Sequence, residues 1–178
     1  MPLVLRLARP YSAAMRILGI DPGLNITGYG IIELSGDHCV HLHHGTVRTR
    51  STEELSLRLV AIRDGVRAVA NQWEVDAAAI EASFVGTNAR SALALGQARA
   101  AAILGIADAG LGVHEYAPTV VKRTTAGYGR GEKSQIAEMV RLQLGLERVP
   151  HPADAADALA IAITHWAHAR TQGLGLRT

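Results

Sequence analysis

The stretch Arg16–Gly23 constrains the fold more than any other part of the chain. Its short apolar run with two isoleucines is typical of a buried central strand. Pro22 cannot donate a ladder hydrogen bond and Gly23 readily enters a turn, so we expect the strand to end at Asp21. The carboxylate of Asp21 would then lie at the mouth of an apolar sheet, where an unpaired charge is costly. Either a structural cap or ion pair, or a metal ion, would satisfy it.

The composition is that of an ordinary soluble globular domain. Of the 178 residues, 48% are hydrophobic, 19% charged and only 4% aromatic, which predicts an aliphatic core. A net charge of +2 permits a nucleic-acid partner without requiring one. The single cysteine, Cys39, excludes an internal disulfide framework and a cysteine-rich zinc site, and it fits a reducing, cytoplasmic location. No apolar run approaches membrane-spanning length.

Residues 16–170 are predicted to form a single domain, because no internal repeat or second domain is visible. Residues 1–15 contain two arginines and no acid, and the arginines interrupt the apolar stretch that a secretory signal would need. Composition permits a transit peptide, but we expect a disordered or dispensable extension, since Met15 directly precedes the first strand and could itself be the start. Residues 171–178 are expected to form a flexible tail.

Hydrophobic periodicity predicts an α/β fold with a five-stranded mixed sheet flanked by helices. Strands are expected at 16–21, 27–34 and 39–47, joined by short turns into an antiparallel meander. Two later strands, 77–81 and 113–116, follow helices and are expected to run parallel to the first. A capping-box pattern at 51–54 precedes the first of the predicted helices, which are 55–73, 88–109, 119–125, 133–144 and 153–170.

Three further acids are placed to join Asp21. Glu81 ends the fourth strand as Asp21 ends the first, so both carboxylates would lie at one edge of the sheet. Asp154 and Asp157 are three residues apart on the last helix and share a face. The helix dipole alone would explain that pair, but four converging carboxylates without matched basic residues favour bound cations. All-oxygen ligation selects Mg²⁺ or Mn²⁺ rather than zinc.

Two such ions about 3.5–4 Å apart are the usual device for phosphodiester hydrolysis. One ion would turn water into the attacking hydroxide, the other would stabilise the departing 3′ oxygen, and Asp21 would bridge both. Phe84, the only phenylalanine, is either a core residue or an aromatic that stacks on an unpaired base. Basic residues interleaved with glycines indicate either a solvated surface loop or one that closes over phosphates, and they are Lys122, Arg123, Arg130 and Lys133.

The histidines are not expected to bind metal. His41, His43 and His44 are predicted to face solvent from a strand, while His165 and His168 are predicted to decorate the last helix. His151, three residues before Asp154, is the one histidine placed to approach the acids.

Taken together, these motifs resemble those of the RuvC family, the bacterial crossover junction endodeoxyribonucleases or Holliday junction resolvases. The resemblance runs from Arg16 to about His168 and leaves out only the two ends of the chain. Its motifs, in order, are Gly19–Gly23 with Gly28, Ile80–Glu81 with Phe84, Lys122 with the glycine-rich run to Ser134, and Asp154–Ala160.

The resemblance implies an RNase H-like fold and a homodimer that makes symmetric paired nicks in a four-way junction, in DNA recombination and repair. It matches Lys122 and Lys133 to two important basic positions, Lys133 among the catalytic ones, and Phe84 to an aromatic near the junction. The helix from Asn88 would supply much of the dimer interface, and the RuvA–RuvB branch-migration complex is the family's usual partner. The acids that it implies as catalytic ligands of two Mg²⁺ ions, with Mn²⁺ as a substitute, are Asp21, Glu81, Asp154 and Asp157.

Three other functions are compatible with some of these features. An ATP-binding protein of the actin and sugar-kinase type shares the strand followed by Asp-x-Gly, but it needs two such domains, and 178 residues are too few. A non-catalytic junction-binding module is disfavoured because all four acids are intact. The remaining alternative is another RNase H-like nuclease that acts on RNA or on other branched DNA.

Overall fold

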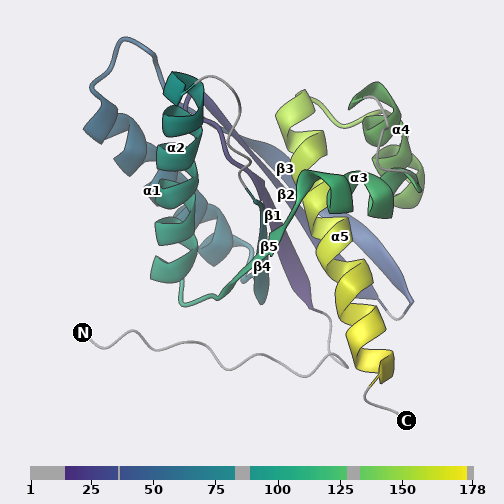
Figure 1. Cartoon of the computed structure of the whole chain (residues 1–178). Coiled ribbons are helices and arrows are strands. Elements are labelled where there is room, and N and C mark those ends of the chain that lie inside the picture. Colours follow the sequence, from purple (N-terminus) through teal and green to yellow (C-terminus); the bar gives the residue numbers. More distant parts are fainter. Residues whose placement is uncertain (1–14, 36, 83–88, 128–132, 176–178) are drawn as a thin grey trace.

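The structure is a computed structural model that describes residues 15–35, 37–82, 89–127 and 133–175. Strands and helices alternate along the chain much as the hydrophobic periodicity predicts (Figure 1). In chain order they are β1 (Arg16–Asp21), β2 (Ile26–Ser35), β3 (His38–Arg48), α1 (Leu55–Gln72), β4 (Ala77–Glu81), α2 (Ala89–Asp108), β5 (Val113–Tyr116), α3 (Pro118–Ala126), α4 (Lys133–Gln143) and α5 (Ala153–Gly175).

The five strands form one mixed sheet in the order β3-β2-β1-β4-β5. The first three strands pair antiparallel, β4 runs parallel to β1, and β5 runs parallel to β4. The predicted five-stranded mixed sheet is therefore confirmed. Ile17, Leu18 and Ile20 are fully buried, as a central strand covered on both faces requires.

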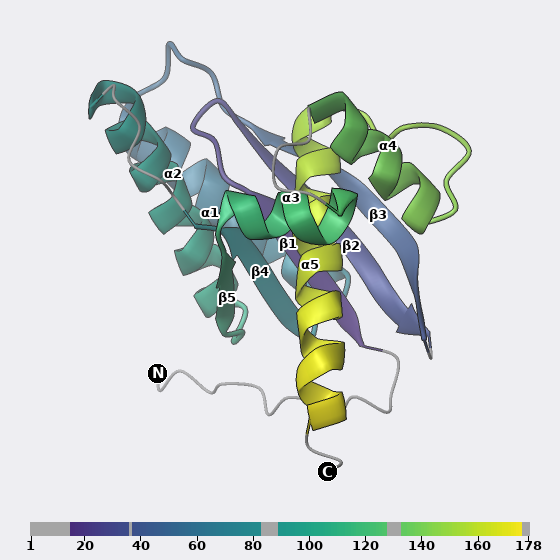
Figure 2. The ribbon, with the colours of Figure 1, turned by 45° about the vertical axis from the view of Figure 1, so that its right-hand side comes forward.

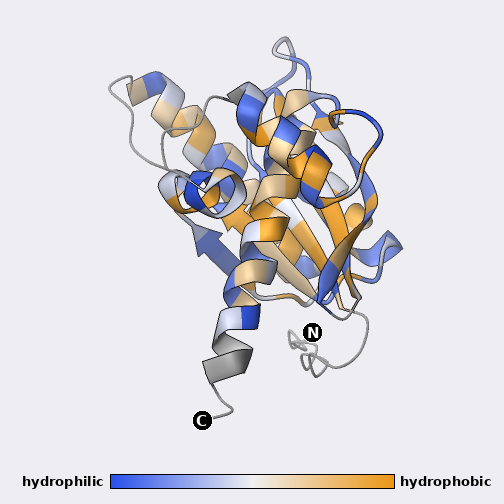
Figure 3. Ribbon diagram, turned by 90° about the vertical axis from the view of Figure 1, so that its right-hand side faces the viewer, coloured by the Kyte–Doolittle hydropathy of each residue, from blue (hydrophilic) through white to orange (hydrophobic). Residues whose placement is uncertain are grey.

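Helices cover both faces of the sheet (Figures 1 and 2). Successive residues of β1 point to opposite faces, so Ile17 joins the core beneath α5, while Leu18 and Ile20 join the core beneath α1 and α2. Figure 3 shows apolar residues along the central strands and on the helix faces toward them. Among the described helices, none has the length and apolar character needed to cross a membrane.

Helix α5 lies directly against the sheet because glycines remove the side chains between them. A Cβ atom built on Gly19 would collide with the carbonyl oxygen of Ala158, and one built on Gly28 would collide with that of Asp154. A Cβ on Gly30 would come within 2.6 Å of the Leu159 side chain. The backbones of β1 and β2 therefore fix both the height and the register of α5 over the sheet.

Two local predictions are wrong. The capping box at 51–54 does not form, because α1 begins at Leu55 with Glu54 as its N-cap and no side-chain cap. The Glu53 carboxylate instead accepts a hydrogen bond from the backbone N–H of Arg50 at 3.2 Å. Near the C-terminus of the chain, α5 continues to Gly175 instead of ending at residue 170. Arg170 holds this part of the helix through its ion pair with Asp37 and its contact with the Trp166 ring.

The contact between α5 and the sheet leads to a stability prediction. Gly19→Ala should lower the free energy of unfolding by about 3 kcal/mol, near the upper end of the cost of overpacking, because its Cβ would meet helix backbone. Urea denaturation would measure the loss. The matched control is Gly96→Ala in α2, where an added Cβ meets nothing within 4 Å and a gain of up to about 1 kcal/mol is expected. Equal effects of the two substitutions would contradict this packing.

Candidate active site

The carboxyl ends of β1 and β4 carry the first two predicted acids. The parallel register pairs Ile20 with Ile80, so Asp21 and Glu81 follow side by side at the same edge. Neighbouring strands lie about 4.8 Å apart, which places these two half-buried side chains within reach of one another. The sheet edge predicted from two strand-ending acids is therefore present.

Helix α5 brings the other two acids to this edge. Gly28 is the partner of Asp21 in the antiparallel register, and the backbone of Asp154 lies directly against Gly28. Asp157 follows on the next turn and lines the same pocket as Asp21 and Glu81. Asp154 is not among the residues that line this pocket; it is in the first turn of α5, where the helix dipole favours a negative charge.

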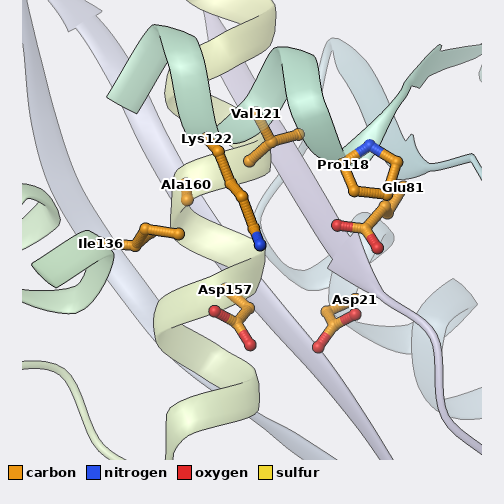
Figure 4. Close-up of a pocket in the computed structure, with 8 residues that line it drawn as sticks. All are labelled: Asp21, Glu81, Pro118, Val121, Lys122, Ile136, Asp157 and Ala160. Atoms are coloured by element: carbon orange, nitrogen blue, oxygen red, sulfur yellow. The ribbon is translucent and has the colours of Figure 1, made fainter. Parts of the chain in front are cut away.

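The pocket has a volume of about 190 Å³ and is lined by three acidic side chains and one basic side chain. In Figure 4 the carboxylates of Asp21, Glu81 and Asp157 point into a shared space, and the Lys122 ammonium enters it from α3. The other lining residues are Pro118, Val121, Ile136 and Ala160. An apolar wall behind the charges strengthens their interactions, because the local dielectric is lower than in water.

The chemistry of these donors fits a divalent cation bound through oxygen. The pocket is lined by carboxylates, with no histidine or cysteine among its residues, and hard ions such as Mg²⁺ and Mn²⁺ prefer such ligands. Within the ranges that the structure describes, no three acidic, histidine or cysteine side chains are already gathered closely enough to hold a metal ion.

The remaining predicted DNA-binding residues lie outside the pocket or outside the described residues. Arg123 is on α3, one residue after Lys122, with an exposed side chain that does not line the pocket. Lys133 begins α4, but its side chain, like the whole of Phe84 and Arg130, falls outside the described part of the chain.

The prediction that His41, His43 and His44 face solvent is wrong, because all three are half-buried. An irregularity in the β2–β3 register at this point lets His41 and His44 share a face, with Nε2 and Nδ1 2.7 Å apart. Burial lowers the pKa of both rings. His43 instead stacks on the ring of Trp73, the residue that follows α1. His151 is exposed.

His165 was also expected at the surface, but it is only 4% exposed. Burial, with smaller contributions from His114 and His168, lowers its pKa to about 4. Its Nδ1 lies 2.9 Å from the hydroxyl of Tyr116, and Tyr116 pairs with Glu81 in the β4–β5 register. The contact between His165 and Tyr116 was not predicted from the sequence. The pairing of Tyr116 with Glu81 could have been, because each of these two residues ends its strand.

Cys39 lies in the core beneath α5, where burial raises the pKa of its thiol. It takes no part in the pocket.

A mixed sheet in this strand order, with acids at the ends of β1 and β4 and on a helix laid across them, defines an RNase H-like nuclease. The family model for crossover junction endodeoxyribonuclease RuvC matches residues 17–165, which is most of the chain. The chain belongs to the RuvC family of crossover junction endodeoxyribonucleases.

Individual relatives agree with this assignment. The chain is 48% identical over 151 residues to the crossover junction endodeoxyribonuclease RuvC of Chloroflexus aurantiacus, covering 85% of this chain and 92% of that protein. It is 45% identical over 163 residues to that of Heliobacterium modesticaldum, covering 92% of this chain and the whole of that protein. Its fold matches Thermus thermophilus RuvC, solved in complex with a Holliday junction substrate, with a TM-score of 0.83, 36% identity, and coverage of 89% of this chain and 96% of that one.

The buried His165 predicts a dependence of stability on pH. Its pKa is about 4 in the folded chain and near 6.5 in the unfolded chain, so the unfolded state binds the proton first as the pH falls between these values. This titration should remove about 3 kcal/mol of stability between about pH 7.5 and pH 4.

His165→Gln removes the titration while leaving Tyr116 a hydrogen-bond partner, and urea denaturation at both pH values would measure the difference. The free energy of unfolding of His165→Gln should fall by about 3 kcal/mol less than that of the parent protein over this pH range. His38→Gln changes an exposed histidine and serves as the control. If His165→Gln kept the pH dependence of the parent protein, His165 would not be the group that causes it.

Proposed function

We propose that this chain is a metal-dependent endonuclease that resolves Holliday junctions during DNA recombination and repair. The observation that carries the proposal is the acidic pocket at the shared end of β1 and β4, in a chain of the RuvC family. Thermus thermophilus RuvC, which this chain matches over nearly its full length, was solved with a Holliday junction substrate. Four-way junction DNA is accordingly the proposed substrate.

In this proposal, two Mg²⁺ ions, replaceable by Mn²⁺, are held by Asp21, Glu81, Asp154 and Asp157. When bound, such ions supply Lewis-acid activation of water and neutralise the charge that develops on the leaving oxygen. Asp21 would hold these ions together with its neighbours, since Glu81 stands beside it on β4 and the backbone of Asp154 lies over its partner Gly28 on β2. The apolar wall excludes bulk water from one side of the reacting phosphate.

Lys122 supplies the positive charge that the described wall of the pocket presents to a phosphate. Its ammonium points toward the space that the three carboxylates share, so it can hold a non-bridging phosphate oxygen while the acids hold cations (Figure 4). Lys133 is also proposed to have a catalytic role. Arg123, Arg130, Lys133 and Phe84 are proposed as contacts to the junction.

The chain is further proposed to act as a homodimer, since paired nicks in opposing strands need two active sites. Helix α2 supports this, because Leu93 and Leu104 are exposed on it at a spacing of three helical turns. Exposed leucines on one face of the helix would suit a contact with a second subunit. The RuvA–RuvB branch-migration complex is the proposed partner, and the cytoplasm is the proposed location.

The decisive experiment compares a synthetic four-way junction, a linear duplex of the same sequence and an RNA–DNA hybrid, each with Mg²⁺, Mn²⁺ or a chelator. Symmetric paired nicks in the junction alone, absent with the chelator, are expected. Equal cleavage of linear duplex would overturn junction selectivity. Preferential cleavage of the hybrid would favour the alternative, a nuclease that acts on RNA.

Asp21→Asn should abolish cleavage of the junction while leaving its binding nearly intact. The amide is close in size to the carboxylate but carries no charge, so it cannot hold a bridging cation as well. Cleavage assays and fluorescence anisotropy would measure the two properties separately. Asp64→Asn, which changes an acid on α1 outside the pocket, should keep both. Cleavage by Asp21→Asn at the parental rate would exclude a metal-bridging role for this residue.

Lys122→Ala should slow cleavage by about 100-fold, the cost of one donor aimed at developing charge. It should also lessen the salt dependence of junction binding by about one unit of slope, as the loss of one phosphate contact does. Lys122→Arg keeps the charge and should restore the salt slope. An unchanged slope in Lys122→Ala would argue against a phosphate contact.

A further inference from the structure

Arginines without acidic partners gather next to the turn that follows Asp21. Arg48 ends β3, Arg50 lies two residues later, and Arg58, in the first turn of α1, contacts Thr49 between them. The backbone N–H of Thr49 donates to the carbonyl oxygen of Asn25 at 3.0 Å, which ties the segment after β3 to the β1–β2 turn. We refer to Asn25, Arg48, Arg50 and Arg58 as the basic rim.

Arg58 is the unusual member, because it is a charged side chain with only 8% of its surface exposed. Its Nε donates to Thr49 Oγ1 at 3.0 Å, and its Nη2 donates to the carbonyl oxygen of Leu24 at 3.1 Å and to Asn25 Oδ1 at 2.5 Å. All three acceptors are neutral. A buried cation is costly to desolvate and is normally paired with a carboxylate.

Six arginines elsewhere in the described chain differ from the rim in this respect, whereas Arg123 and Arg148 form no ion pair with a described residue either. Carboxylate partners are present for Arg16, Arg63, Arg67, Arg99, Arg141 and Arg170. For Arg48, Arg50 and Arg58, by contrast, no ion pair forms with any residue that the structure describes. Among the described residues, the guanidinium groups of the rim therefore have no carboxylate within ion-pair distance, which leaves them able to pair with an anionic partner.

The guanidinium group of Arg58 also has one nitrogen that donates no hydrogen bond within the described chain. Its Nη1 has no acceptor among the described residues, yet it is not one of their two fully buried unpaired polar atoms, Thr125 Oγ1 and Trp166 Nε1. Solvent therefore reaches Nη1. Three bonds on the protein side hold the guanidinium rigid, and its free end can donate to a phosphate without further loss of side-chain entropy.

The position of the rim relates it to the acidic pocket. The sheet order places β2 and β3 on one side of Asp21 and β4 with Glu81 on the other. Figures 1 and 2 show the β1–β2 turn and the segment after β3 together at the end of the sheet where β1 and β4 stop. A strand that places one phosphate at Asp21 and continues toward β3 would therefore pass along the rim.

We infer that the basic rim binds backbone phosphates of the DNA strand that enters the acidic pocket, on the β2–β3 side of the cleaved bond. Two exposed acids directly precede α1, namely Glu53 and Glu54, but the Glu53 carboxylate accepts from the backbone N–H of Arg50 and not from its guanidinium. The inference rests on the proposed function, because it takes junction DNA as the substrate.

The test measures binding of a four-way junction by the full chain carrying Asp21→Asn, as a function of salt between about 50 and 200 mM, where phosphate contacts dominate. Into this parent are introduced Arg48→Gln with Arg50→Gln, or Arg58→Gln alone. The matched control is Arg67→Gln, which removes an arginine of α1 that is already paired with Asp64. Thermal denaturation of each variant reports folding.

The double variant should bind about tenfold or more weakly and reduce the slope of log K against log salt by about one to two units. Arg58→Gln should reduce it by about one unit, and Arg67→Gln should match the parent. If Arg58→Gln does not fold, the surface double variant decides. If the double variant folds and keeps the parental slope and affinity, the inference about the rim is wrong, while the proposed function stands. Failure of the parent with an intact rim to bind the junction would instead overturn the proposed function.

Discussion

The contact between α5 and the sheet is the constraint on which the rest of the structure depends. Glycines at positions 19 and 28 allow helix backbone to touch strand backbone, with no side chain available to take up an error. The acids of α5 are therefore carried on one rigid body with those of β1 and β4. A cation site assembled from separate elements needs this rigidity, since ligand positions must hold to a fraction of an ångström.

Acidic and basic side chains occupy different places around that rigid edge. The acids lie in the pocket, which is backed by Val121 and Ile136. The basic groups are Lys122, at the pocket, and the basic rim beyond the β1–β2 turn. This arrangement suits a polyanion that must approach an acidic centre, because the outer charges attract the strand while cations neutralise the inner ones.

Much of this site could be predicted from the sequence because its determinants are local. Pro22 stops the first strand at Asp21, the strand-ending position of Glu81 sets its place in a parallel sheet, and the spacing of Asp154 and Asp157 sets their shared face. The contacts that could not be predicted all depend on side chains from distant segments. Arg58 reads in sequence as one more charge on an amphipathic helix, and its burial is set by the turn at Leu24.

The histidines show the same limit. An alternating strand predicts that His41 and His44 point to opposite faces, and a single irregularity in the β2–β3 register brings them together. His165 reads as a surface residue because the residues around it on α5 are mixed, but the edge strand β5 covers it with Tyr116. Register and edge coverage are properties of the assembled sheet and not of any one segment.

The burial of Cys39 has a practical consequence for observing this protein at work. Its thiol is shielded in the core and its raised pKa disfavours the reactive thiolate at neutral pH. A second cysteine placed at an exposed position would then be the chain's selectively reactive thiol, without first removing the native one. A fluorophore attached there would report the binding and release of a nucleic acid, with little labelling of the buried Cys39.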